Sequence, residues 1–168
     1  YGDIDVIPGN IHRTYDKIVA ELTPILDKGI VPIIIGGDHS ISLGNLRAFH
    51  KKYGAVSLVH FDSHSDTWND YYGERYMHGT PFRRAVEEGL IDPRHSIQIG
   101  LRGPLYSAQD YEDARELGFE VVPMKEVRKI GFDQVMKRIH ERVENRPVFV
   151  SYDIDFVDPA YAPGTGTP

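Results

Sequence analysis

Short apolar runs alternate with amphipathic stretches along the whole chain, and this alternation restricts the fold more than any other feature. The stretches between the runs repeat apolar residues at steps of three and four, as helices do. Because the runs are short and rich in Val and Ile, they suit strands buried on both faces of a sheet. Strands that alternate with helices predict βαβ units, so we expect an α/β three-layer sandwich with a mostly parallel sheet flanked by helices. The runs cover residues 31–35, 56–61, 96–101, 119–122 and 147–152.

The predicted helices follow from the same periodicity and from residues that end helices. Residues 11–26 carry an apolar stripe, and Gly29 can end that helix. A second helix over 43–49 should stop near Gly54. Further helices are predicted over 80–88, from a cap at Ser107 to Gly118, and over 132–143.

Length and composition indicate one globular domain. The chain has 168 residues, of which 40% are hydrophobic and 26% are charged, which is enough for one core. We therefore expect a single domain over 1–168. Because the first residue is Tyr1 rather than Met and the chain stops inside a glycine-rich run at Pro168, we expect that domain to be incomplete at both ends.

Charge and hydropathy exclude several classes of partner. A formal net charge of −6 and a pI near 5.7 argue against nucleic acid. The longest apolar stretch, residues 30–35, is too short to cross a bilayer, and the N-terminus shows no export signal. We therefore expect a cytoplasmic protein, with organellar targeting upstream of residue 1 left open. There are no cysteines, so any metal must be held by nitrogen and oxygen.

Residue types that bind metals follow three of the predicted strands. In open parallel sheets, sites form at the carboxyl ends of the strands. Since residues two apart on an extended backbone point the same way, we expect the aspartates and histidines of each segment to share a face. The segments are Gly-Gly-Asp-His-Ser at 36–40, His-Phe-Asp-Ser-His-Ser-Asp at 60–66 and Ser-Tyr-Asp-Ile-Asp at 151–155.

Divalent cations explain why such groups would gather. The shared faces bring together four carboxylates and one imidazole, namely Asp62, Asp66, Asp153, Asp155 and His64. Without a cation these carboxylates would repel one another and be costly to desolvate. Two cations about 3.5–4 Å apart would use the whole set, and the water between them would lose a proton near neutral pH. Carboxylates with imidazoles suit manganese better than a soft metal.

Each motif also has a simpler interpretation. An isolated Asp-x-Asp is more often a cap or turn, and Asp-x-His-x-Asp can be a solvated loop, but three such motifs at one edge are improbable by chance. Gly36-Gly37 fits a tight turn that also lets His39 approach a metal. His78 is either a surface histidine or a proton carrier, and the loop 158–168 is either an active-site loop or a rigid connector.

The three motifs in this order resemble the ureohydrolases, the arginase and agmatinase family. The resemblance extends through the Pro- and Gly-rich residues 158–168 and covers essentially the whole chain. It implies a dimanganese centre, with nickel or zinc as alternatives, in which Asp62 and Asp153 bridge. The implied ligands are His39, Asp62, Asp66 and Asp153 for one metal, and Asp62, His64, Asp153 and Asp155 for the other.

The resemblance also implies a reaction. A hydroxide shared by the metals would attack the guanidinium carbon of a small substrate and give urea and an amine. Asp66 would hold the hydroxide proton, and His78 would help proton transfer. Residues 73–85 resemble agmatinases and guanidino-acid hydrolases more than arginases. Agmatine, which yields putrescine for polyamine biosynthesis, is therefore the leading substrate.

Several alternatives remain open within this resemblance. Guanidinobutyrate, guanidinopropionate and arginine are the other candidate substrates, and a formimino-hydrolase is a related enzyme class. The paired motifs argue against a deacetylase of the same broad fold. A further alternative is that the chain is a catalytically incomplete metal-binding fragment. The family also implies a homo-oligomer, either a trimer or a hexamer.

Overall fold

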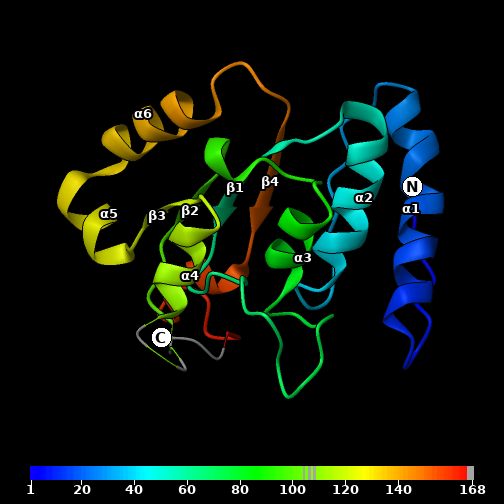
Figure 1. The fold of residues 1–168 in the computed structure, drawn as a ribbon, viewed down its shortest axis with the longest axis horizontal. Helices are drawn as coiled ribbons and strands as arrows, with labels where there is room; N and C mark the ends of the chain where they lie inside the picture. The colour runs from blue at the N-terminus through cyan, green and yellow to red at the C-terminus, as the bar shows by residue number, and fades with distance from the viewer. Residues whose placement is uncertain (104, 106, 108, 166–168) are drawn as a thin grey trace.

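Four parallel strands form the sheet at the centre of this computed structural model, which describes residues 1–103, 105, 107 and 109–165. The strand order is β3-β2-β1-β4, and every neighbouring pair is parallel. This confirms the predicted parallel α/β architecture (Figure 1). The strands are β1 (Ser57–Phe61), β2 (Ile97–Ile99), β3 (Glu120–Val122) and β4 (Val148–Tyr152).

The predicted helices are present, with small changes in their bounds. The helix predicted to start at Ser107 begins instead at Asp110. A helix that the sequence did not reveal follows Pro123; it has seven residues, and its three apolar side chains, Met124, Val127 and Ile130, are too few to show a clear period. No helix in the described ranges is long and apolar enough to cross a membrane. The helices are α1 (Ile11–Asp27), α2 (Ile41–Tyr53), α3 (Pro81–Glu87), α4 (Asp110–Glu116), α5 (Met124–Ile130) and α6 (Phe132–Val143), with short 3-10 turns η1 (Pro93–His95) and η2 (Ile154–Phe156).

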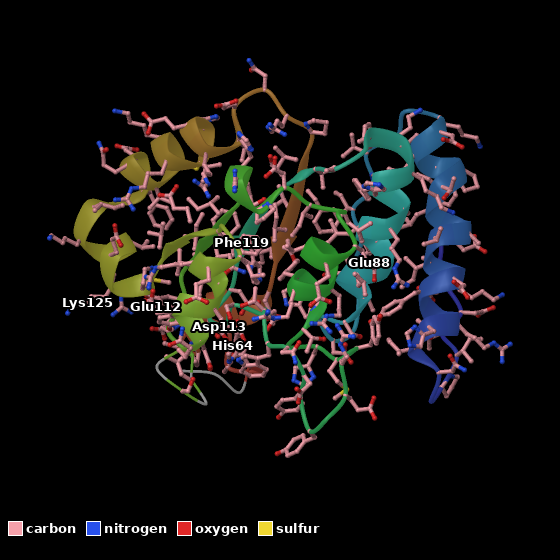
Figure 2. All side chains as sticks on the ribbon, viewed as in Figure 1. His64, Glu88, Glu112, Asp113, Phe119 and Lys125 are labelled. Atoms are coloured by element: carbon pink, nitrogen blue, oxygen red, sulfur yellow. The ribbon has the colours of Figure 1, made fainter. Side chains whose placement is uncertain are left out.

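Helices cover both faces of the sheet. Neighbouring residues of a strand point to opposite faces, so a strand of consecutive apolar residues needs a core on each side. Leu58 of β1 joins a core formed with α2, α3 and α4, whereas Val59 joins a core formed with α5 and α6. Phe119, just before β3, is buried in the first of these cores (Figure 2). A third cluster packs α1 onto α2 through Ile18 and Ala48. The layers of Figure 1 follow from these three clusters.

The strand predicted over residues 31–35 is wrong. This segment makes no strand, and Val31, Ile33 and Ile35 are 85%, 91% and 93% exposed. A groove of about 440 Å³, lined by residues of both segments, separates it from β4. A strand needs ladder hydrogen bonds from a neighbour, and among the described residues this segment is paired with no strand. The apolar pattern identified a segment that resembles a strand, but it could not show whether another strand lies beside it.

The register of β1 and β4 places the ends of these two strands side by side. Phe61 is paired with Tyr152, so Asp62 and Asp153 are the next residue on each strand. The backbone N–H of Asp153 donates to the carbonyl of Phe61 at 2.9 Å, and that of Asp62 donates to Ile99 at 3.1 Å. Two aspartates thus leave the sheet at one point. Beyond them, residues 158–165 form turns, and the predicted loop's last three residues, 166–168, lie outside the described part.

Candidate metal centre

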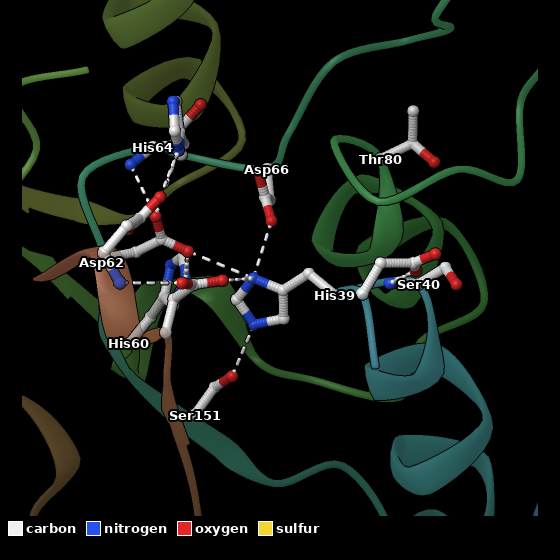
Figure 3. Close-up of polar contacts among 12 residues, drawn as sticks. His39, Ser40, His60, Asp62, His64, Asp66, Thr80 and Ser151 are labelled. Carbon is white, nitrogen blue, oxygen red and sulfur yellow. Dashed lines mark hydrogen bonds and ion pairs between the residues drawn. The ribbon is translucent and has the colours of Figure 1, made fainter. Parts of the chain in front are cut away.

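Three segments meet at the carboxyl ends of β1 and β4. His39 lies in the turn that leads into α2, the 62–66 segment follows β1, and Asp153 and Asp155 follow β4. Figure 3 shows the side chains of His39, Asp62, His64 and Asp66 directed toward one another. The structure therefore brings together residues from all three motifs that the sequence singled out.

His39 lies at the centre of one group of carboxylates. Its Nδ1 is 2.8 Å from Oδ2 of Asp66, 3.1 Å from Oδ2 of Asp62 and 3.4 Å from Oδ2 of Asp153. This nitrogen is buried and forms no hydrogen bond of regular geometry with them. The other ring nitrogen, Nε2, lies 2.8 Å from the hydroxyl of Ser151. An Nε2–H donated to Ser151 leaves Nδ1 facing three oxygens, and either a proton or a cation at this position would offset their negative charge.

His64 forms a second group with Asp155 and the other oxygen of Asp62. Its Nδ1 is 3.1 Å from Oδ2 of Asp155 and 3.4 Å from Oδ1 of Asp62. Ligand atoms of these three residues all lie within 4.8 Å of one another. Asp62 thus presents Oδ2 to His39 and Oδ1 to His64, which is the position of a carboxylate that bridges two sites (Figure 3).

The backbone brings these residues together by turning rather than by staying extended. The N–H of His64 donates to Oδ1 of Asp62 at 2.6 Å, and Asp66 has a φ of 50°. After β4, the side chain of Asp153 accepts from the N–H of Asp155 at 2.9 Å. The predicted convergence is confirmed, but the extended geometry used to predict it is wrong. Aspartate side chains bond the backbone two residues on and so turn the chain.

Hydrogen bonds hold the two loops against each other. The N–H of Ser63 donates to Oδ1 of Asp155 at 3.0 Å, which joins the loop after β1 to the loop after β4. The guanidinium of Arg102 donates to the carbonyl of Asp155 at 2.7 Å and also to those of Phe156 and Val157. Arg102 therefore fixes the turn that carries Asp155.

Burial and neighbouring charges shift the pKa values of Asp62 and Asp66 in opposite directions. Burial would raise the pKa of Asp62, but His60 and the contacts with His39 and His64 hold this pKa well below its usual range. Burial raises the pKa of Asp66, and the neighbouring charge of Asp62 raises it further. Two adjacent buried carboxylates therefore do not ionise equally without a cation.

The histidines respond to the same negative charge. Burial would lower the pKa of His39, but the carboxylates of Asp62 and Asp66 raise it well above its usual value. Asp155 and then Asp62 raise the pKa of His64 to about 10. Protons on these rings balance the carboxylates where a cation would otherwise do so. The donors are all nitrogen and oxygen, as manganese prefers.

The structure places His78 apart from this network. Its ring lies against Tyr71, with the ring centroids 5.2 Å apart and the rings near perpendicular. Within residues 1–103, 105, 107 and 109–165, no polar contact joins His78 to the carboxylate cluster. Its predicted role in proton transfer stays a prediction.

One residue in contact with the carboxylate cluster was missed by the sequence analysis. His60 was quoted in its motif but given no role, although it is fully buried and its Nε2 lies 2.8 Å from Oδ2 of Asp62. His60 stands two residues before Asp62, at the spacing by which residues of a strand face one way. Extending the spacing argument back into the strand would have found it.

Comparison with known proteins shows the family of this chain. Residues 1–168 match the sequence model of the Arginase family. The chain belongs to the arginase family. A guanidinobutyrase of Pseudomonas aeruginosa is 46% identical over 99% of this chain and 52% of its own length. A mitochondrial agmatinase of Gallus gallus is 43% identical over 99% of this chain and 49% of its own length.

Solved structures of arginase-family members share the fold. The proclavaminate amidinohydrolase of Streptomyces clavuligerus superposes with a TM-score of 0.89 at 44% identity, over 99% of this chain and 56% of that structure. This confirms the predicted arginase-like arrangement of sheet and helices. The chain spans about half the length of the curated relatives it matches.

Proposed function

We propose that the protein hydrolyses the guanidinium group of a small substrate to urea and an amine at a two-metal centre. The observation that carries this proposal is that the two oxygens of the Asp62 carboxylate face two different histidines. One oxygen lies 3.1 Å from Nδ1 of His39 and the other lies 3.4 Å from Nδ1 of His64, and each histidine has a further carboxylate of its own. A carboxylate shared between two histidine–carboxylate groups can bridge a pair of cations.

The donors divide into two sets that share two members. Manganese is the proposed metal, with nickel or zinc as alternatives. When bound, the cations would activate a water for attack on the guanidinium carbon and would stabilise the negative charge that develops. The proposed sets are His39, Asp62, Asp66 and Asp153 for one metal, and Asp62, His64, Asp153 and Asp155 for the other.

Two residues of the chain are proposed to move protons. Asp66 lies beside His39, with its Oδ2 2.8 Å from Nδ1, and would hold the proton of the attacking water. His78, in the loop before α3, would pass a proton to the departing amine. Its contact with Tyr71 places it in an aromatic group that also includes Trp68, whose ring stacks on Tyr71 at 5.4 Å.

Agmatine is the proposed substrate, with guanidinobutyrate, guanidinopropionate and arginine as alternatives. Relatives named agmatinase, guanidinobutyrase and guanidinopropionase match this chain at 43%, 46% and 42% identity, so overall similarity does not separate them. What these names share is a guanidine substrate. The names therefore support hydrolysis of a guanidinium group more strongly than they support any one substrate. A homo-oligomer, either trimeric or hexameric, is part of the proposal.

A second candidate is that this chain binds metal but does not turn over substrate alone. The observation that favours it is coverage, because the chain spans 52% of the guanidinobutyrase it resembles. A formimino-hydrolase is the remaining alternative within the family, and it would release formamide or ammonia in place of urea.

One experiment separates these candidates. The manganese-loaded chain is given agmatine, guanidinobutyrate, guanidinopropionate or arginine, and urea is measured beside bound metal and beside an Asp153→Asn control. Urea from one substrate, lost in the control, establishes the hydrolase and its specificity. Metal binding without urea from any of the four, and without formamide or ammonia from a formimino compound, supports the metal-binding fragment. A chain that binds no metal refutes the two-metal centre.

A further inference from the structure

We infer that Gln98 and His60 form a hydrogen-bond relay that orients the carboxylate of Asp62 and thereby sets the metal affinity of the centre. This inference rests on the proposed two-metal centre, because Asp62 is its proposed bridging ligand. His60 and Gln98 are therefore positioning residues, which act through Asp62 and do not touch metal or substrate.

The two residues are a buried pair on neighbouring strands. His60 of β1 and Gln98 of β2 are register partners, and both side chains are completely buried. The ring of Phe82 lies 4.4 Å from the ring of His60 and covers it. Polar side chains buried this deeply are costly unless they are hydrogen-bonded, so their contacts determine what they do.

The contacts of Gln98 fix the direction of the relay. Its Nε2 lies 2.6 Å from the carbonyl oxygen of Ser65, which can only accept, so this end of the amide must be the nitrogen. The same Nε2 lies 3.2 Å from Nδ1 of His60. Nδ1 must then be the acceptor, and the proton of the neutral ring must be on Nε2.

This proton assignment makes His60 a donor to Asp62. Nε2 of His60 lies 2.8 Å from Oδ2 of Asp62, so the chain of donation runs from Gln98 through His60 to the carboxylate. Both ring nitrogens of His60 are then occupied, one as acceptor and one as donor. Although His60 lies near His39 and Asp62 in a cluster of ligand types, it has no lone pair left for a cation.

The amide of Gln98 is held in this orientation at a cost. Its Oε1 is buried without a hydrogen-bond partner among the described residues. Rotating the amide by half a turn would place that oxygen against the carbonyl of Ser65, which is worse, so the nitrogen stays where it donates twice. Ser65 belongs to the segment that carries Asp62 and Asp66, and Gln98 therefore also ties this segment to β2.

The relay leaves Asp62 oriented for two sites. Oδ2 receives the proton of His60, and Oδ1 receives the backbone N–H of His64 at 2.6 Å. Each oxygen has one donor from the protein and keeps lone-pair capacity for a cation. Hydrogen-bond partners behind a metal ligand typically contribute about 10–100-fold to metal affinity.

The first measurement is the tautomer of His60 in the metal-free chain, by nitrogen-15 NMR of labelled histidines at mildly alkaline pH. The relay requires a proton on Nε2 and none on Nδ1. In Gln98→Glu the new carboxylate accepts and does not donate, so a proton should appear on Nδ1. A proton on Nδ1 of the unaltered chain, alone or together with Nε2, would overturn the relay without any reference to metal.

The second measurement is manganese binding by calorimetry to the unaltered chain and to matched variants. His60→Phe and Gln98→Leu keep the volume but remove the donors, so we expect metal affinity to fall by about tenfold or more. His60→Gln can place an amide N–H near the position of Nε2 and should recover much of the loss. Recovery by Gln but not Phe separates hydrogen bonding from packing.

The outcomes distinguish the two proposals. If the unaltered chain binds manganese and His60→Phe binds equally well, the relay is refuted and the proposed function stands. If the unaltered chain binds no metal, the proposed two-metal centre is refuted and the relay has no metal affinity to set. Should His60→Phe fail to fold, the tautomer measurement still decides whether the relay exists.

Discussion

Oδ2 of Asp62 lies 3.1 Å from Nδ1 of His39, although the two residues come from different motifs and different elements of the fold. The contact exists because β1 ends beside the turn that begins α2. Since the second oxygen of Asp62 faces His64, this one carboxylate connects both halves of the candidate metal centre. Loss of Asp62 should therefore weaken metal binding in both halves, whereas loss of a ligand on one side should weaken it in that half alone.

Asp62→Asn should abolish tight binding of both metals, whereas Asp155→Asn should leave one. Asp62 reaches both histidines, but Asp155 contacts only the His64 side. The affinity lost in Asp62→Asn should exceed about 100-fold, because even a partner behind a ligand contributes about 10–100-fold. Metal content after gel filtration, measured by mass spectrometry, gives the stoichiometry. Equal stoichiometry in the two variants would contradict a bridging Asp62.

Metal binding near neutral pH should release a proton from His64. Without metal, Asp155 and Asp62 raise its pKa from 6.5 to about 10, so the ring is protonated at neutral pH. A raised pKa stabilises the metal-free fold fully below pH 6.5, and this contribution is lost as pH rises through about 10. A metal needs the neutral ring, so its affinity should rise with pH over the same window.

Calorimetry in two buffers of different ionisation enthalpy counts the released protons. Asp155→Asn should release fewer protons for two reasons: the His64 side loses a metal ligand, and the first cause of the raised pKa of His64 is removed. Binding with no proton release in the unaltered chain would show that His64 is already neutral.

Gly103→Ala should weaken the His64 side of the centre. A Cβ at this position would lie 2.6 Å from Cδ2 and Nε2 of His64 and 3.0 Å from the carbonyl of Ser63. The backbone cannot move away easily, because the N–H of Gly103 donates to that carbonyl at 2.7 Å. We expect a loss of about 1–3 kcal/mol in the free energy of unfolding, as for other overpacked sites.

Denaturant unfolding and metal titration of Gly103→Ala measure the two effects. Gly164→Ala is the control, since a Cβ there meets nothing within 4 Å. The control should match the unaltered chain in both assays. A Gly103→Ala variant that binds two metals with unchanged affinity would mean that His64 can move without leaving its ligand position.

The sequence predicted where the candidate ligand residues converge because strand ends can be recognised from local patterns. β1 and β4 are apolar runs that stop at Asp62 and Asp153, and parallel strands bring such ends together. Local sequence patterns failed where the structure depends on a pairing partner or on side-chain geometry. Residues 31–35 look like a strand but pair with none in the described part of the chain, and α5 is too short to show a period. The contact of His60 with Gln98 joins two strands, so local spacing cannot show it.

The unpaired segment 31–35 should make this chain associate with itself. Val31 and Ile33 are largely exposed and line the groove opposite β4, whose residue Val150 is 61% exposed. An apolar segment beside an unpaired strand edge is a site where chains pair. Ile33→Lys and Val150→Lys should each reduce association and the fluorescence of a bound apolar dye.

Analytical ultracentrifugation over a range of concentrations tests this association. Tyr72→Lys is the matched control, because Tyr72 is 87% exposed but does not line the groove, and it should leave association unchanged. If Tyr72→Lys disperses the chain as well as Ile33→Lys does, added charge and not the groove is the cause. If the unaltered chain stays monomeric and binds no dye, the segment does not present its apolar side chains as the structure places them.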